Sequence, residues 1–140
     1  MSLNTLEEIA KYIVSDGKGI LAADESNPTC GKRFDSIGVE STESNRRDYR
    51  EMLFRSSGMK DNIGGVILFD ETIRQNAQDG TPLVDLIKNQ GALPGIKVDK
   101  GLAPLVSSPE ETLTQGLDGL DERCKEYLTL GAKFTKWRAV

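Results

Sequence analysis

The sequence predicts an α/β protein in which parallel strands alternate with helices. Four short apolar runs, each ending in charged residues, have the length typical of buried strands. These runs are Gly19–Glu25, Gly65–Glu71, Gly95–Lys100 and Ala132–Arg138. Helical patterns separate them, and this alternation predicts parallel strands joined by right-handed crossovers.

The helical patterns occupy the intervals around these runs. The first extends from about Thr5 to Ser15, with Thr5 or Asn4 as its N-cap. Three more run from about Thr42 to Ser56, from Leu83 to a stop at Gly91, and from Leu117 to a stop at Gly131. Two architectures share this order: an open doubly wound sheet and part of a (β/α)8 barrel. A complete barrel needs ~200 residues or more, so four strands would make about half of one.

Composition limits the chemistry. The chain has 140 residues, the length of one domain, with 18 Lys plus Arg against 22 Asp plus Glu and a net charge of −4. A mildly acidic chain has no general attraction for nucleic acid or membranes, so neither is expected as a partner. Histidine is absent, which excludes Ser-His-Asp and Cys-His catalysis and histidine-ligated metal sites.

The sequence also bears on the location of the protein. The distant Cys30 and Cys124 are expected to be reduced, and no secretory signal or membrane-spanning run is evident, so a cytoplasmic location is expected.

Ionisable residues gather where the predicted strands end, which is where parallel α/β proteins carry their chemistry. Because residues two apart share a face of a strand, Lys97 lies with Asp99, and Lys136 lies with Arg138. Asp24 closes the first strand in the same way. If these faces point into a barrel, they supply cations for a phosphorylated anion, a carboxylate that accepts a proton and lysines that attack carbonyls. The alternative is a set of solvated charges that pair with one another.

Basic residues outside the strands have other interpretations. The segment Gly31-Lys32-Arg33 follows the first strand and is either an anion contact or an ordinary basic surface loop. Arg46 and Arg47 are predicted to lie on a solvated helix face. Trp137 is predicted to point away from the charged face, into the layer between sheet and helices.

Five segments resemble class I fructose-bisphosphate aldolases, in the family's order and over nearly the whole chain. They are Gly17–Ser26, Gly64–Thr72, Gly95–Gly101, Thr114–Leu120 and Lys136–Arg138. The resemblance implies an α/β fold of the (β/α)8 TIM barrel type. Residues 1–140 would supply about its first half, as four parallel strands with helices forming an incomplete domain.

The same resemblance implies an activity and a site. The family reversibly cleaves fructose 1,6-bisphosphate to dihydroxyacetone phosphate and glyceraldehyde 3-phosphate, in glycolysis and gluconeogenesis, through a Schiff base on lysine and without a metal or other cofactor. Asp24 matches the aspartate that assists proton transfer and orients the substrate. Lys97 and Lys136 match interior lysines, and Lys136 resembles the one beside the scissile carbon–carbon bond. The implied substrate contacts are Arg33, Lys32, Ser26 and Arg138, with Thr29 as a weaker polar contact.

The family's acid/base glutamate, Schiff-base lysine and main phosphate loops are expected beyond Val140. The 140-residue chain by itself is therefore expected to be marginally stable and inactive, with open sheet edges. A homotetramer is expected of the full-length form. Two alternatives stay open at this point: a non-catalytic remnant or interaction module that keeps the half barrel, and an unrelated flavodoxin-like phosphate-binding protein.

Overall fold

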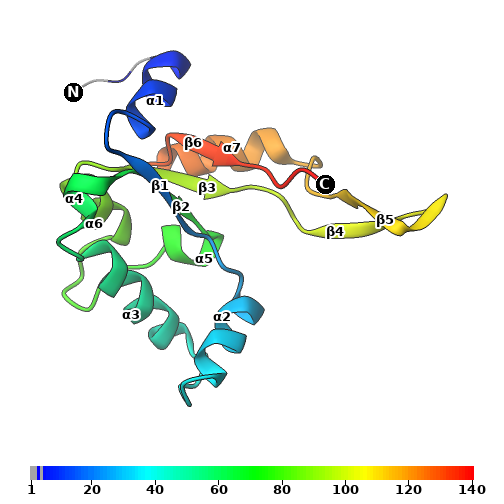
Figure 1. Ribbon diagram of the computed structural model, residues 1–140, viewed down its shortest axis with the longest axis horizontal. Helices are drawn as coiled ribbons and strands as arrows, with labels where there is room; N and C mark the ends of the chain where they lie inside the picture. Colours follow the sequence, from blue (N-terminus) through cyan, green and yellow to red (C-terminus); the bar gives the residue numbers. More distant parts are fainter. Residues whose placement is uncertain (1–2, 4) are drawn as a thin grey trace.

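Four parallel strands form the central sheet of the computed structural model, which describes residues 3 and 5–140 (Figure 1). In spatial order the strands are β1 (Gly19–Ala23), β2 (Ile63–Leu68), β3 (Leu93–Lys97) and β6 (Phe134–Lys136). Each pairs in parallel with the next, so the four predicted strands are confirmed. Their spatial order equals their chain order, without the reversal that defines a doubly wound sheet. The flavodoxin-like alternative is therefore wrong.

Seven helices accompany the sheet in the described part of the chain. They are α1 (Leu6–Ile13), α2 (Asn27–Asp35), α3 (Glu43–Phe54), α4 (Met59–Asn62), α5 (Asp70–Ile73), α6 (Leu83–Asn89) and α7 (Leu120–Thr129). The predicted helices are confirmed as α1, α3, α6 and α7. None of the described helices has the length and apolar character needed to cross a bilayer.

The core lies between one face of the sheet and the helices α3 to α7. Val66, Leu68 and Ile96 point to this outer face and are fully buried. They belong to one cluster with the α6 side chains Leu83 and Ile87, which are also fully buried. Trp137 is half-buried against the same cluster, as predicted. Alternation along each strand therefore directs the apolar residues outward to the helices and leaves the other face for different side chains.

Helix α1 begins at a capping box. The Thr5 hydroxyl accepts a hydrogen bond from the Glu8 amide at 3.2 Å, and the Glu8 carboxylate accepts one from the Thr5 amide at 3.0 Å. Asn4, the other predicted N-cap, lies outside the described residues. Figure 1 shows α1 on the opposite side of the sheet from α3 and α6. Ile13 at its end contacts the β2 glycines Gly64 and Gly65, so α1 covers the amino ends of the strands.

Two features differ from the sequence prediction. The segment containing Lys32 and Arg33 is part of helix α2, so the surface-loop interpretation is wrong; Pro28 lies in the first turn, where its missing N–H costs nothing. An antiparallel hairpin of β4 (Leu102–Leu105) and β5 (Ser108–Thr114) was not expected. Figure 1 shows this hairpin extending well away from the sheet as an arm, with the fully exposed Val106 at its turn.

The inner face of the sheet is closely packed at its amino end and open at its carboxyl end. Gly95 on β3 is paired with Phe134 on β6, and a side chain on Gly95 would overlap the Phe134 ring. Gly65 on the neighbouring strand β2 lies under the same ring. Towards the carboxyl ends the inner positions are Ala22 and Lys97, followed by Asp24 and Asp99 beyond the strands, and these line an open cavity.

We expect Gly95→Ala to destabilise the protein by about 1–3 kcal/mol, because the added methyl group would displace the Phe134 ring. Urea unfolding measures the change. Gly19→Ala is the matched control, since nothing lies within 4 Å of a side chain built there. The double variant Gly95→Ala with Phe134→Leu should recover part of the loss. Equal stability of the Gly95 and Gly19 variants would contradict this account of the inner face.

Candidate active site

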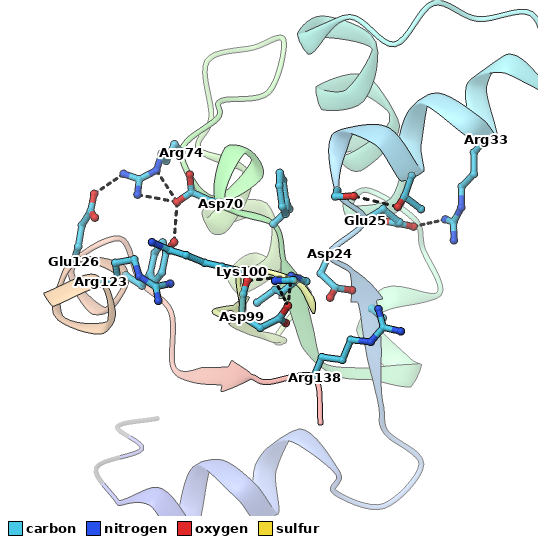
Figure 2. A pocket seen from close by; sticks show the side chains of 17 residues that line it. Asp24, Glu25, Arg33, Asp70, Arg74, Asp99, Lys100, Arg123, Glu126 and Arg138 are labelled. Atoms are coloured by element: carbon cyan, nitrogen blue, oxygen red, sulfur yellow. Dashed lines mark hydrogen bonds and ion pairs between the residues drawn. The ribbon is translucent and has the colours of Figure 1, made fainter. Parts of the chain in front are cut away.

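A cavity of about 810 Å³ opens at the carboxyl ends of the parallel strands. Figure 2 shows that side chains from β1, β3 and the chain after β6 converge on it, together with side chains from α2, α5 and α7. Counting Lys136, which contacts the lining residue Asp24, its walls carry seven basic and five acidic side chains. The excess of positive charge favours an anionic ligand.

Asp24 and Lys136 meet across this cavity. Their carboxylate and ammonium groups are 3.0 Å apart, although 112 residues separate them in the chain. They come from the two edge strands, β1 and β6, which in a flat sheet would lie roughly 14 Å apart. That distance exceeds what the two side chains and their contact can span. The sheet must therefore curve towards its inner face, as a barrel wall does.

Lys97 forms a second ion pair beside the first. Its ammonium donates to the Asp99 carboxylate at 2.7 Å and to the Asp99 main-chain oxygen at 3.1 Å. Burial alone would raise the pKa of Asp99, but the hydrogen bonds from Lys97 and from the Gly101 amide outweigh it, so the pKa is lowered. Asp99 is therefore a carboxylate and Lys97 has an anionic partner at neutral pH. The predicted grouping of Asp24, Lys97 and Lys136 on one cavity matches the geometry.

The predicted substrate contacts divide into two groups. Ser26, Arg33 and Arg138 line the cavity, as does Thr29, whose hydroxyl is 3.1 Å from that of Ser26. Lys32 does not line it; the side chain is exposed on α2 and the helix turns it away from the strand ends. Arg33 donates to the Glu25 carboxylate and to the Tyr49 hydroxyl, so its guanidinium is held at the rim of the cavity.

Arg50 on α3 supports the end of β1 from the helical side of the sheet. The sequence alone did not indicate this role. The side chain is 2% exposed and donates to the main-chain oxygens of Ala23 and Glu25, to the Glu25 carboxylate and to the Cys30 sulfur. Its guanidinium also lies over the Tyr49 ring. These bonds fix the chain on both sides of Asp24, and so fix the direction of that carboxylate. The partners are far apart in sequence, so no local pattern could have indicated them.

A second support lies between α3 and α5. Arg46 forms a two-point ion pair with Glu71, with bonds of 2.8 and 2.7 Å, and is only 11% exposed. The prediction of a solvated position is therefore wrong for Arg46, because Glu71 at the start of α5 lies within reach. Arg47 pairs with Asp48 and is partly exposed, so its position is closer to the predicted solvated helix face.

An acidic and basic group on α5 and α7 forms the far wall of the cavity. Arg74 donates to Asp70 at 2.9 Å and to Glu126 at 2.5 Å, and the Tyr127 hydroxyl donates to Asp70 at 2.9 Å (Figure 2). Burial opposes ionisation of Asp70, but the bonds from Arg74 and Tyr127 outweigh it and lower the pKa of Asp70. Arg74, Asp70 and Glu126 are paired with one another, so this wall holds the cavity in shape and its charged groups already have partners. Within the described residues, no group of three His, Cys, Asp or Glu is arranged to hold a metal ion.

A curved parallel α/β sheet with paired lysines and carboxylates at its strand ends defines a barrel-type protein with a strand-end site. A family model described as fructose-bisphosphate aldolase class-I matches residues 5–140, and the chain belongs to that family. The expected fold class, a (β/α)8 barrel of which this chain supplies about the first half, is confirmed by this membership and by the solved structure that follows.

Individual relatives agree over the whole chain. A probable class 1 fructose-bisphosphate aldolase of Xanthomonas campestris is 54% identical over 140 residues, which are 100% of this chain and 42% of the relative. Fructose-bisphosphate aldolase 6, cytosolic, of Arabidopsis thaliana is 60% identical over 94% of this chain and 37% of its own length. The solved aldolase of Plasmodium falciparum, in complex with TRAP and an inhibitor, has a TM-score of 0.91 at 53% identity, over 94% of this chain and 38% of that chain. The chain thus spans about two fifths of the length of the relatives it matches.

We expect Arg50→Met to lower the free energy of unfolding by about 3–5 kcal/mol, because it removes the donor that the Glu25 carboxylate and the main-chain oxygens of Ala23 and Glu25 share in a nearly dry environment. Chemical denaturation measures the loss. Arg47→Met on the same helix is the control and should leave the midpoint nearly unchanged, since its ion pair is solvated. If both variants unfold at the same denaturant concentration, Arg50 does not anchor β1.

The ion pair of Glu71 predicts a loss of stability in acid. The hydrogen bonds from Arg46 lower the pKa of Glu71 below its ordinary value of 4.5. The unfolded chain therefore binds this proton more readily, and the stabilisation is present above about pH 4.5 and is lost as pH falls through the folded-state pKa. We expect wild type to be more stable than Glu71→Gln at pH 7, and the difference to shrink towards pH 3. A difference independent of pH, measured by urea unfolding, would exclude the ionised pair as its cause.

Proposed function

We propose that this chain supplies the amino-terminal half of the barrel of a class I fructose-bisphosphate aldolase. The reaction is the reversible, metal-independent cleavage of fructose 1,6-bisphosphate to dihydroxyacetone phosphate and glyceraldehyde 3-phosphate, in glycolysis and gluconeogenesis. The observation that carries this proposal is the contact between Asp24 and Lys136 across the curved sheet. It supports a site in which a carboxylate and an ammonium act on the same substrate atoms.

In the proposed reaction Asp24 and Lys136 serve the cleaved carbon–carbon bond. As the C4 hydroxyl gives its proton to a carboxylate of the site, the C3–C4 bond breaks. C4 becomes the carbonyl carbon of the aldehyde product, and the electron pair of the broken bond goes to C3, where the Schiff base takes it up. The Lys136 ammonium stabilises negative charge on the hydroxyl oxygen, because it is a fixed donor in a partly enclosed cavity. The Asp24 carboxylate, 13% exposed, orients that ammonium and assists the proton transfer. The Schiff-base lysine is proposed to come from the part of the barrel outside this chain.

The phosphate groups of such a substrate suit the cationic rim. Arg138 lines the cavity, and no acceptor contacts its guanidinium among the described residues, whereas Arg33 is held by Glu25. We assign phosphate contacts to Arg138 and Arg33, with the Ser26 hydroxyl as a further donor, whereas Lys97 stays paired with Asp99 among the catalytic side chains. Lys32 is left out of this proposed set because it lies outside the cavity lining. A cytoplasmic, homotetrameric enzyme is proposed for the complete protein; cytosolic relatives support the location.

The complete gene product that carries residues 1–140 tests this function. We expect it to cleave fructose 1,6-bisphosphate, and Lys136→Met or Asp24→Asn to lower kcat by about 10²–10⁴-fold, the usual contribution of a positioned acid or base. Lys125→Met is the control: this exposed α7 lysine pairs with Asp121 on its own helix and lies outside the cavity lining, so its loss should leave kcat unchanged. Borohydride with dihydroxyacetone phosphate should trap a covalent adduct on the complete product, whereas a polypeptide of residues 1–140 should give neither adduct nor turnover. A folded gene product without cleavage, or full activity of Lys136→Met, refutes the proposal.

A further inference from the structure

Asp99 is a buried carboxylate with one oxygen unaccounted for. Asp99 lies two residues after the end of β3, and its side chain is only 1% exposed. One oxygen, Oδ1, accepts from Lys97 at 2.7 Å and from the Gly101 amide at 3.2 Å. The other, Oδ2, is buried and has no hydrogen-bond partner in the described part of the chain. Such unpaired groups are rare in folded proteins and call for a specific explanation.

Stability does not explain why this pair is kept. Removing both an ammonium and a carboxylate from water costs as much as their attraction returns, and a buried apolar pair of similar volume is commonly at least as stable. The unpaired Oδ2 adds a further cost. The pair contributes little to the core, because Lys97 and Asp99 lie on the inner face, away from the cluster that holds the helices. A role at the cavity is the remaining physical reason.

The geometry shows what Asp99 does to the neighbouring charges. The cavity floor holds two lysines and two carboxylates, which could pair in more than one way. Asp99 offers Lys97 two acceptors, its Oδ1 and its main-chain oxygen, both two residues past Lys97 at the end of β3. Lys97 is thereby held on β3, and Asp24 is left with Lys136 at 3.0 Å. Lys136 also acts electrostatically on Asp99 and helps to lower its pKa, so more than one pairing of these lysines and carboxylates is within reach.

We propose that Asp99 is a positioning residue that holds the Lys97 ammonium on β3 and thereby keeps Asp24 paired with Lys136 alone. The inference rests on the proposed function for its catalytic consequence, but the pairing itself is a property of the folded chain. Without the Asp99 charge, Lys97 is released and competes with Lys136 for Asp24. The lowered pKa of Asp99 agrees with this arrangement, since the carboxylate stays ionised despite its burial.

Lysine acylation of the complete gene product, mapped by mass spectrometry, tests the pairing without any turnover. In the wild type Lys97 should react more slowly than the exposed Lys125. Asp99→Asn should raise the rate at Lys97 by about tenfold or more, because the ammonium loses its anionic partner and keeps only neutral oxygen acceptors. Asp24→Asn should raise the rate at Lys136 and leave Lys97 slow. The inference is overturned if Lys97 and Lys125 react at the same rate in the wild type, a comparison that needs no variant. It is also overturned by an unchanged Lys97 rate in Asp99→Asn.

A double-mutant cycle separates positioning from a merely structural effect. Asp99→Asn should lower kcat/KM by more than about tenfold in the wild type but by less than about twofold in a Lys97→Gln background, since Asp99 acts through Lys97. Glu71→Gln is the control for lost stability, and its effect should be the same in both backgrounds. Equal losses from Asp99→Asn in both backgrounds overturn the inference. Slow acylation of Lys97 that rises in Asp99→Asn, found in a gene product that does not cleave the sugar bisphosphate, would instead support the pairing and reject the proposed function.

Discussion

Curvature of the parallel sheet is the constraint on which the site depends. Asp24 and Lys136 come from its two edge strands, and they touch only because those edges turn towards each other. The amino end of the inner face permits this closure: Gly65 and Gly95 carry no side chain, so the Phe134 ring lies directly over them. A side chain at Gly95 would displace the Phe134 ring, and one at Gly65 would crowd it. A packing detail near the amino ends of the strands thus sets a distance between charges at their carboxyl ends.

The charges at the strand ends are supported in layers. Asp24 faces the cavity, and the adjacent Glu25 faces back to Arg50, which is buried against the main chain of β1 and the start of α2. The next strand has the same arrangement: Asp70 and Glu71 follow β2, Asp70 pairs with Arg74 at the end of the same helix α5, and Glu71 pairs with Arg46 on α3. Each carboxylate therefore has a cation in the helical layer or in the cavity. Fixed pairs of this kind allow polar side chains to be held in place near the core, where an unpaired charge would be costly.

The sequence predicted the strands well because each is an apolar run of suitable length ending in charge, and it predicted the inner face because alternation has a period of two. The resemblance then supplied the roles of Asp24, Lys97 and Lys136. Helix α2 was missed because Pro28 and Gly31 are typical of a loop, and the hairpin because its side chains are mostly exposed and show no apolar alternation. The ion-pair partners could not be predicted, since Arg50 and Glu25 lie 25 residues apart on different elements and meet only through the packing of α3.

The pairing pattern also divides the cations of the cavity by what they are free to do. Lys97, Lys136 and Arg33 each have a carboxylate partner, so an incoming anion meets them already oriented and partly neutralised. Among the described residues, Arg138 and Lys100 have no acceptor for their charged groups, and Arg123 donates to main-chain oxygens without a carboxylate partner, so these three carry the uncompensated positive charge. An anionic group is therefore drawn first to the unpaired cations at the rim, while the paired lysines stay with their carboxylates at the floor. Attraction of the anion and proton transfer at the floor of the cavity thus depend on different side chains. A charged group paired with a partner is held in a fixed position, whereas a charged group without a partner exerts the longer-range field.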